Sequence, residues 1–328
     1  MSVAAKTAQS RKETRQDASA SQAEAEQFRF SGHETFACRF AWLPKACQLI
    51  RTRPESWSDD EQAMVEMGLG KNMVKSLRFW AFAMGVVSSR SGKEIAITEF
   101  GEQIFGAKGL DPYIEHLATP WLLHWKLASN LSIPLYAWHF MFNRWPYPEF
   151  SRSDVLKIFE RESGRLGQPH SAVTLAQHLD IFLHTYLPSK SGTSIEDSLD
   201  GPLADLGLLE VVGETRGDGG RREPTYSFRR GRKPEISQAV FRFVVEDYWQ
   251  KRRPDEGTIS LRELCVGDCS PGRILMLSED DVRLRLEATQ EEGEHRSFDY
   301  LPSAIDGRIV RTVKNIREPN IRLAYGRS

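Results

Sequence analysis

The sequence has few cysteines and no long apolar run. Its 328 residues include only 4 cysteines, which excludes a disulfide-built scaffold and favours a reducing, cytoplasmic location. No stretch approaches the roughly 18 apolar residues that a transmembrane helix needs, and the N-terminus lacks the apolar core of a signal peptide. Charge of one sign is not in excess, because 44 Lys and Arg face 45 Asp and Glu. This balance excludes a uniformly basic protein and leaves room for a locally basic face.

Large apolar side chains are nearly absent from the N-terminal segment. Residues 1–27 contain one Val and no Ile, Leu, Phe, Tyr or Trp. Such a segment buries too little apolar surface to offset the entropy of ordering, so we expect a disordered tail, with a docked helix as the alternative. Three further parts are expected: a winged helix-turn-helix over 28–110, a helical domain with a possible second winged helix over 111–255, and a C-terminal helical segment with a basic tail over 256–328.

The pattern predicts a mainly α fold with short β-hairpins. Ser31 and Glu34 have the spacing of a capping box, which predicts a helix from Ser31 that Pro44 interrupts or kinks. Apolar periodicity then predicts helices over 59–67 and 71–84, a hairpin of 86–88 with 94–97, and a helix over 99–105. Helix, helix, turn, helix, hairpin is the order of a winged helix-turn-helix.

A second block repeats this order more loosely. A helix over 171–186 precedes a hairpin of 206–212 with 225–228, and the two blocks are candidates for two divergent winged helices. The other helices are expected over 152–162 and 236–249, near Leu261, and over 278–288.

The helix over 71–84 carries most of the functional information. Its apolar stripe is expected to face the core and comprises Met73, Val74, Leu77, Trp80, Ala81 and Met84. The start of the last helix of a helix-turn-helix enters the major groove, where Lys and Arg suit phosphate or guanine and Asn suits adenine. The predicted DNA contacts on this helix are Lys71, Asn72, Lys75, Ser76 and Arg78. A solvated basic face is the simpler alternative. Phe79 and Phe82 indicate packing on another helix or docking of a protein.

Two further regions are rich in cations. Between residues 214 and 233, seven Lys and Arg face three acids, and the tip of this second hairpin is predicted to hold phosphate through Arg221 and Arg222. A solvated loop is the alternative there. The last 21 residues hold six Lys and Arg against one acid, which suits nucleic acid or an acidic partner protein.

Enzyme and metal motifs are incomplete. Gly68-Leu-Gly-Lys71 lacks the first Gly and the Ser or Thr of a phosphate-binding loop. Cys265 and Cys269 are four residues apart, without a second Cys or His pair at ligand spacing nearby. We therefore expect no metal, no cofactor and no enzymatic activity. His33 and Glu34 could form an acid–base pair, but capping explains Glu34 more simply.

Several motifs span the chain from about residue 28 to 320. They are Phe30-Ser-Gly-His-Glu-Thr-Phe36, Trp42-Leu43, Gly68-Leu-Gly-Lys-Asn-Met-Val-Lys-Ser-Leu-Arg-Phe-Trp80, Asp111-Pro-Tyr113, Trp121-Leu-Leu-His-Trp125, Ser270-Pro-Gly-Arg273 and Glu279-Asp-Asp281. Together they resemble the bacterial family known as domain of unknown function 4007, with departures at Ala37-Cys38 and Pro120. The resemblance implies helix-turn-helix proteins without established enzymatic activity. They are encoded beside phosphoadenosine-phosphosulfate-reductase-like proteins in anti-phage islands linked to DNA phosphorothioation or related modification.

These observations predict a DNA-binding accessory component of a bacterial DNA-modification or anti-phage defence system. Its expected partners are double-stranded DNA and modification or defence proteins encoded nearby, and no membrane. The first alternative is a protein–protein adaptor for a modification enzyme, with DNA binding indirect. The second is an enzyme, which would require His33, Glu34 or Asp111 to converge in one pocket. His124 and His139, which lie among tryptophans, are expected to be satisfied core residues.

Overall fold

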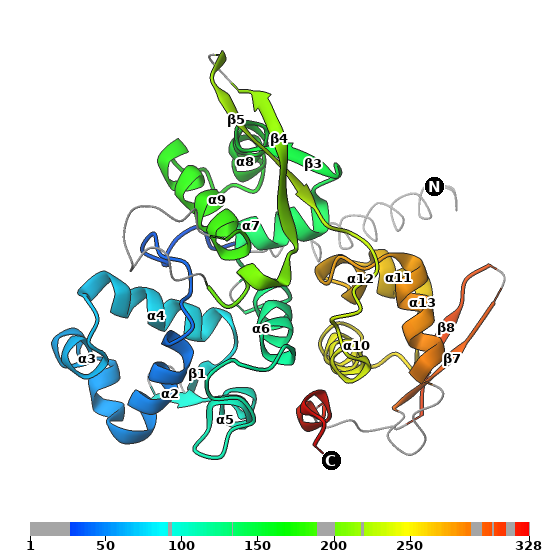
Figure 1. Ribbon diagram of the computed structural model, residues 1–328, viewed down its shortest axis with the longest axis horizontal. Helices are drawn as coiled ribbons and strands as arrows, with labels where there is room; N and C mark the ends of the chain where they lie inside the picture. The colour runs from blue at the N-terminus through cyan, green and yellow to red at the C-terminus, as the bar shows by residue number, and fades with distance from the viewer. Residues whose placement is uncertain are drawn as a thin grey trace, which may run out of the picture.

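The computed structural model describes residues 27–90, 94–132, 134–188, 201–217, 220–289, 297–303, 305–312 and 319–327. The expected tail over 1–27 lies outside these ranges except for Gln27, and Lys314 and Arg317 of the basic C-terminus lie outside them as well. The described residues form a mixed α/β structure of helices and three small antiparallel sheets, two of which project at the outside of the molecule (Figure 1). No helix among them is long and apolar enough to cross a membrane.

The N-terminal block follows the expected order of elements. It contains α2 (Trp42–Thr52), η1 (Pro54–Trp57), α3 (Asp60–Met67), α4 (Lys71–Ala83), β1 (Val87–Arg90), β2 (Glu94–Ile97) and α5 (Glu99–Phe105). Local chemistry sets these boundaries. The Asp59 carboxylate caps α3 by accepting from the backbone N–H groups of Glu61 and Gln62, and Gly68 ends α3 at a φ of 63°.

The prediction of a helix that starts at Ser31 is wrong. Glu34 and Thr35 adopt positive φ angles of 47° and 63°, so the chain turns there, and the helix begins only at Trp42. Pro44 lies in the first turn of α2, where a missing N–H costs no helical hydrogen bond. The capping-box spacing was present, but the segment over 31–36 packs on α4 instead of forming a helix.

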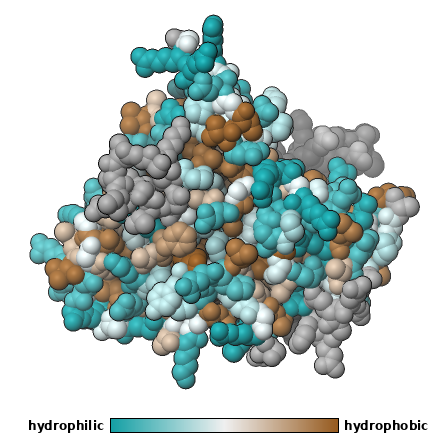
Figure 2. Space-filling model, viewed as in Figure 1, coloured by the Kyte–Doolittle hydropathy of each residue, from teal (hydrophilic) through white to brown (hydrophobic). Residues whose placement is uncertain are grey.

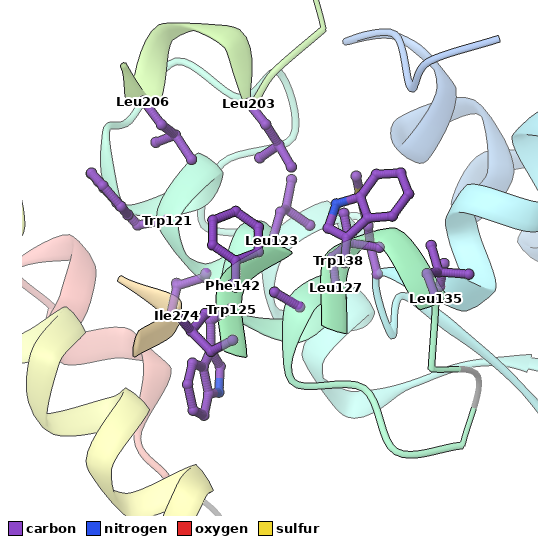
Figure 3. Packing of buried hydrophobic residues seen from close by; sticks show 14 of the residues in the cluster. Trp121, Leu123, Trp125, Leu127, Leu135, Trp138, Phe142, Leu203, Leu206 and Ile274 are labelled. Carbon is purple, nitrogen blue, oxygen red and sulfur yellow. The ribbon is translucent and has the colours of Figure 1, made fainter. Parts of the chain in front are cut away.

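The centre of the molecule is built from aromatic side chains. Its elements are α6 (Ala118–Ala128), α7 (Tyr136–His139), the π-helical turn η2 (Phe140–Arg144), β3 (Glu149–Ser151), α8 (Arg152–Arg165), α9 (Ala172–Tyr186), η3 (Ala204–Leu206), β4 (Leu209–Arg216) and β5 (Arg222–Phe228). Figure 3 shows Trp121, Trp125, Trp138 and Phe142 packed among leucines from several of these elements. Burial of such large side chains is the main source of stability in a core of this kind.

The second hairpin is longer than expected and belongs to a three-stranded sheet. Its order is β3-β5-β4, with Phe150 opposite Tyr226 and Val211 also opposite Tyr226. Strand β3, which is short and directly precedes α8, was not predicted from the sequence. A bulge between Val211 and Gly213 interrupts the pairing of β4 with β5.

The C-terminal part packs against α6 and returns to it at its end. It contains α10 (Gln238–Arg252), β6 (Thr258–Ser260), α11 (Leu261–Val266), α12 (Pro271–Ile274), α13 (Glu279–Ala288), β7 (Phe298–Leu301), β8 (Arg308–Arg311) and η7 (Ile321–Tyr325), with sheet order β6-β8-β7. The Tyr325 hydroxyl lies 2.8 Å from the Thr119 hydroxyl on α6. One cluster of buried hydrophobic residues extends from Phe28 to Ala324.

Candidate nucleic-acid interface

Helix α4 has one buried face, which fixes its position. Val74, Leu77, Trp80, Ala81 and Met84 are fully buried, as the predicted apolar stripe requires, and the sixth member, Met73, is half-buried against the same core. The Trp80 indole N–H also donates to the Phe36 carbonyl at 2.9 Å. This combination holds α4 rigidly against the segment that precedes α2.

Ser76 does not belong to the exposed face. Its side chain is fully buried, and its hydroxyl donates to the His33 carbonyl at 2.8 Å. The prediction that Ser76 approaches DNA is therefore wrong. The reason is a long-range contact: the segment over 31–36 covers the side of α4 on which Ser76 lies, and a helical wheel cannot show this.

The start of α4 presents positive charge to solvent. Lys71, Asn72 and Lys75 are exposed. The N-cap is Gly70, which offers no side-chain acceptor, and the first turn holds no acidic residue. The positive end of the helix dipole therefore adds to the charge of Lys71 and Lys75 at one place. Such a surface favours an anion outside the protein.

Arg78, the next predicted contact, is engaged within the protein. Its guanidinium forms an ion pair with Asp60 on α3 at 2.6 Å and lies over the Trp57 ring at 5.8 Å from the centroid. The hydrogen bond from Arg78, together with the charges of Arg78, Lys71 and Lys75, lowers the pKa of Asp60. Arg78 thus joins α3 to α4 and lies beside the exposed lysines.

The two phenylalanines of α4 have different environments. Phe79 is buried under the N-terminal segment, where the Arg29 guanidinium lies 5.2 Å from its ring centroid. Gly32 passes so close that a Cβ there would lie 2.9 Å from the Phe79 ring. Docking of a partner through Phe79, which the adaptor hypothesis invoked, is therefore wrong for this conformation. Phe82 is half-buried and meets the Trp57 ring edge-to-face.

Hairpin β1–β2 follows α4 and adds one exposed cation, Arg90, that is not among the predicted contacts. Ser88, Ser89 and Arg90 are exposed, whereas Val87 is buried. Arg90 stands opposite Glu94 in the register. Its place at the end of a short strand next to a polar hairpin tip was the signal that could have identified it.

The tip of hairpin β4–β5 is the second cationic surface. Arg216, Arg221 and Arg222 are exposed, and Arg222 pairs with Glu214 at 3.5 Å on an open surface. Figure 1 places this tip at one end of the molecule, away from α4, and Figure 2 shows hydrophilic side chains projecting there. The structure therefore separates the predicted contacts into a helix site and a hairpin site.

A pair of buried histidines connects the segment that packs on α4 to helix α9. His33 Nε2 lies 3.3 Å from His178 Nδ1, and the Ala137 backbone N–H donates to His178 Nε2 at 3.0 Å. His178 must therefore carry its proton on Nδ1 and donate it to His33. Burial, followed by the Arg29 charge, lowers the pKa of His33 to about 4, and burial lowers that of His178 well below the ordinary value. The pair is neutral at neutral pH.

The residues invoked for catalysis have structural partners. Asp111 accepts from the backbone N–H groups of Glu115 and His116 at 2.8 and 3.0 Å. His124 lies 2.8 Å from both the Tyr186 hydroxyl and the Ile274 carbonyl, which confirms it as a satisfied core residue. Among the described residues, one group has donors placed for a metal ion: His139, Asp268 and Cys269.

Comparisons with known proteins agree with the motif-based resemblance. The family model described as "Protein of unknown function (DUF4007)" matches residues 30–304. The structure titled "Magnesium ion-bound SspB crystal structure" is 27% identical with a TM-score of 0.76, over 88% of this chain and 85% of that chain. The "SspB crystal structure" is 26% identical with a TM-score of 0.75, over 92% of this chain and 88% of that one. No curated protein sequence matches the chain.

Proposed function

The chain belongs to the family of unknown function DUF4007, and from this premise we propose that it binds duplex DNA through the start of α4. The observation that carries the proposal is the exposed group Lys71, Asn72 and Lys75 on a helix whose opposite face is locked in the core. Helix α3, the turn at Gly68–Gly70, helix α4 and hairpin β1–β2 have the order of a winged helix-turn-helix. In that arrangement α4 is the helix that enters the major groove.

The two cationic surfaces have different roles in this proposal. Lys71 and Lys75 contact phosphate or guanine, and Asn72 contacts an adenine edge. Arg221 and Arg222 contact backbone phosphate from the hairpin tip, without reading sequence. The resemblance described above and the similarity to SspB support a role as a component of a DNA-modification or defence system of the phosphorothioation type.

The test is a mobility-shift titration with plain and phosphorothioated duplex at several salt concentrations. We expect binding that weakens steeply with salt, and the Lys71→Ala/Lys75→Ala variant should reduce the slope of log affinity against log salt by up to about 1.8. A phosphorothioate keeps the charge of a phosphate, so this slope should be the same for both duplexes. A preference for modified DNA would then come from contacts with the sulfur atom.

A matched control removes two cations at the same helical spacing elsewhere. Arg161 and Arg165 are exposed on α8, and both pair with Glu162. The Arg161→Ala/Arg165→Ala variant changes the net charge by the same amount as the lysine variant. It should keep the wild-type salt slope. Equal losses in both variants, or no binding of wild-type protein to any duplex at low salt, would contradict the α4 site.

We also propose that the chain contributes binding rather than catalysis. His33 and Asp111, two of the residues that a catalytic role would require, are engaged by His178 and by backbone amides. Magnesium, which one SspB structure contains, prefers oxygen ligands in octahedral geometry. The group His139, Asp268 and Cys269 offers one carboxylate with nitrogen and sulfur, so it does not fit magnesium. Nicking of supercoiled plasmid by the purified protein with Mg²⁺ would contradict a purely binding role.

A further inference from the structure

Three side chains with different donor atoms meet where α7 approaches the loop between α11 and α12. His139 is the last residue of α7, and Asp268 and Cys269 lie in the loop. Their donor atoms all lie within 4.8 Å of one another. His139 and Cys269 are buried, whereas Asp268 reaches solvent. The cluster therefore lies at the surface with its nitrogen and sulfur donors on the inner side.

The spacing of the donors suits a tetrahedral metal ion. His139 Nδ1 lies 3.8 Å from Cys269 Sγ. Zinc binds nitrogen at about 2.0–2.1 Å and sulfur at about 2.3 Å, which places two tetrahedral ligands roughly 3.6 Å apart. Imidazole, thiolate and a carboxylate are all common zinc ligands. Small movements would therefore bring the three donors to one ion.

A buried asparagine holds two of the three residues in place. Asn143 Oδ1 accepts from the Cys269 backbone N–H at 2.8 Å, and Asn143 Nδ2 donates to the His139 carbonyl at 3.0 Å. Asn143 lies in the π-helical turn η2, and Cys269 has a positive φ of 51°. Both are uncommon backbone conformations that often occur at functional sites. Here they occur on the two sides of one cluster.

Space for a non-protein ligand adjoins the cluster. A cavity of about 250 Å³ is lined by His139, Cys269, Arg252 and Trp138, among others. The Arg252 guanidinium lies 3.4 Å from the Asp268 carboxylate and so borders both the cavity and the cluster. Three protein ligands beside such a cavity leave room for a water molecule in a fourth position.

We propose that His139, Asp268 and Cys269 form a binding site for a zinc-type divalent cation. The ion would link the α7–η2 segment to the α11–α12 loop, and it would take water as its fourth ligand from the cavity. Binding replaces the Cys269 thiol proton, which is released to solvent. The site is separate from the cationic surfaces on which the proposed function rests, and its test does not use DNA.

The experiment is a cobalt titration of the full chain after chelator treatment under reducing conditions. We expect one equivalent of Co²⁺ to give a thiolate-to-cobalt charge-transfer band, and Zn²⁺ to abolish the band by displacement. Cys269→Ser should remove the band. Asp268→Asn should weaken binding at least about tenfold, because even the loss of an outer-shell partner costs that much. Zn²⁺ should also raise the melting temperature of wild-type protein.

The control is Cys265→Ser, which changes another buried cysteine four residues away and should keep the band. Should Cys269→Ser fail to fold, Asp268→Asn decides the question, because its side chain is exposed and circular dichroism should show a native spectrum. Absence of the band in wild-type protein overturns the proposal, and the 3.8 Å contact is then only a weak thiol–imidazole hydrogen bond. A band that survives Cys269→Ser, or unchanged affinity in Asp268→Asn, overturns it equally.

Discussion

The two helix-and-hairpin blocks of this protein carry their positive charge on different elements. In the first block, the charge lies on the start of α4, at Lys71 and Lys75. In the second, α9 contains no Lys or Arg, and the charge lies at the tip of β4–β5. A helix with a buried opposite face presents side chains in fixed positions, which suits base edges. A hairpin tip exposed along its strands suits phosphate, which requires only charge.

The comparison also shows how the blocks are joined. The segment over 31–36 packs on α4, and its His33 meets His178 of α9 at 3.3 Å. The inner side of the first block is therefore in direct contact with the helix of the second. If the two cationic surfaces act on one duplex, this buried contact is one of those that fix their relative position.

The largest expected effect is a loss of stability when Trp80, which holds α4 in the core, is replaced. Trp80→Ala should lower the free energy of unfolding by about 3–5 kcal/mol, because it leaves a cavity in the core and removes the hydrogen bond to Phe36. Chemical denaturation measures this. Val173→Ala on the exposed face of α9 is the control and should change stability by less than about 0.5 kcal/mol. A near-native Trp80→Ala variant would show that α4 is not held by its buried face.

Acid should weaken the contact between the blocks. The pKa of His33 is lowered to about 4 and that of His178 lies well below its ordinary value, so the unfolded chain binds protons first as the pH falls. Stability is therefore fully present above about pH 6.5 and is lost between about pH 6.5 and 4. The expected loss for His33 is on the order of 3 kcal/mol. Denaturation midpoints measured across this range would show it.

A double variant separates the contribution of the His33–His178 pair to the pH dependence of stability from that of other buried histidines. Burial also lowers the pKa of His124 to about 4, so it contributes in the same pH range. The His33→Gln/His178→Gln variant should keep the His124 share and lose the rest of the pH dependence. An unchanged dependence in this variant would mean that the pair does not couple stability to pH.

Local patterns predicted the helices well and the contacts between them poorly. Apolar periodicity identified the helices that became α8, α9, α10 and α13, because this signal acts within a few residues. The capping-box spacing, another local signal, failed at Ser31, where packing on α4 and two left-handed residues prevent a helix. Long-range packing there overrides a correct local pattern.

The candidate sites also show that local patterns in the sequence miss contacts between distant residues. The helical periodicity of residues 71–84 correctly predicted that Lys71 and Lys75 are exposed, because this prediction requires only the helix and the position of its apolar stripe. It placed Ser76 wrongly because the covering segment lies 43 positions away in sequence. The contact of His139 with Cys269 joins residues 130 positions apart, so no ligand spacing in the sequence could reveal it.

Asn72 provides a finer test of the helix site. If its amide reads an adenine edge, Asn72→Ala should cost about 1–3 kcal/mol at one base position and relax the sequence preference there. The salt slope should stay unchanged, because no charge is removed. Binding measured against a set of duplexes with single substitutions would show both effects. Equal loss on every duplex would contradict base reading and leave α4 as a phosphate-binding helix.

The smallest expected effect belongs to the hairpin site. Arg221→Ala/Arg222→Ala removes two cations, but Arg222 already pairs with Glu214 at 3.5 Å, so part of its charge is offset before DNA arrives. We expect the salt slope to fall by about 0.9, half the maximum expected for the lysine pair, and the sequence preference to stay as in wild type. Folding should be unaffected, since both side chains are exposed. The measurement is the same duplex titration, and Glu214→Ala should strengthen binding slightly by releasing Arg222. A change in sequence preference in the arginine variant would contradict the contrast between a helix that reads bases and a hairpin that contacts phosphate.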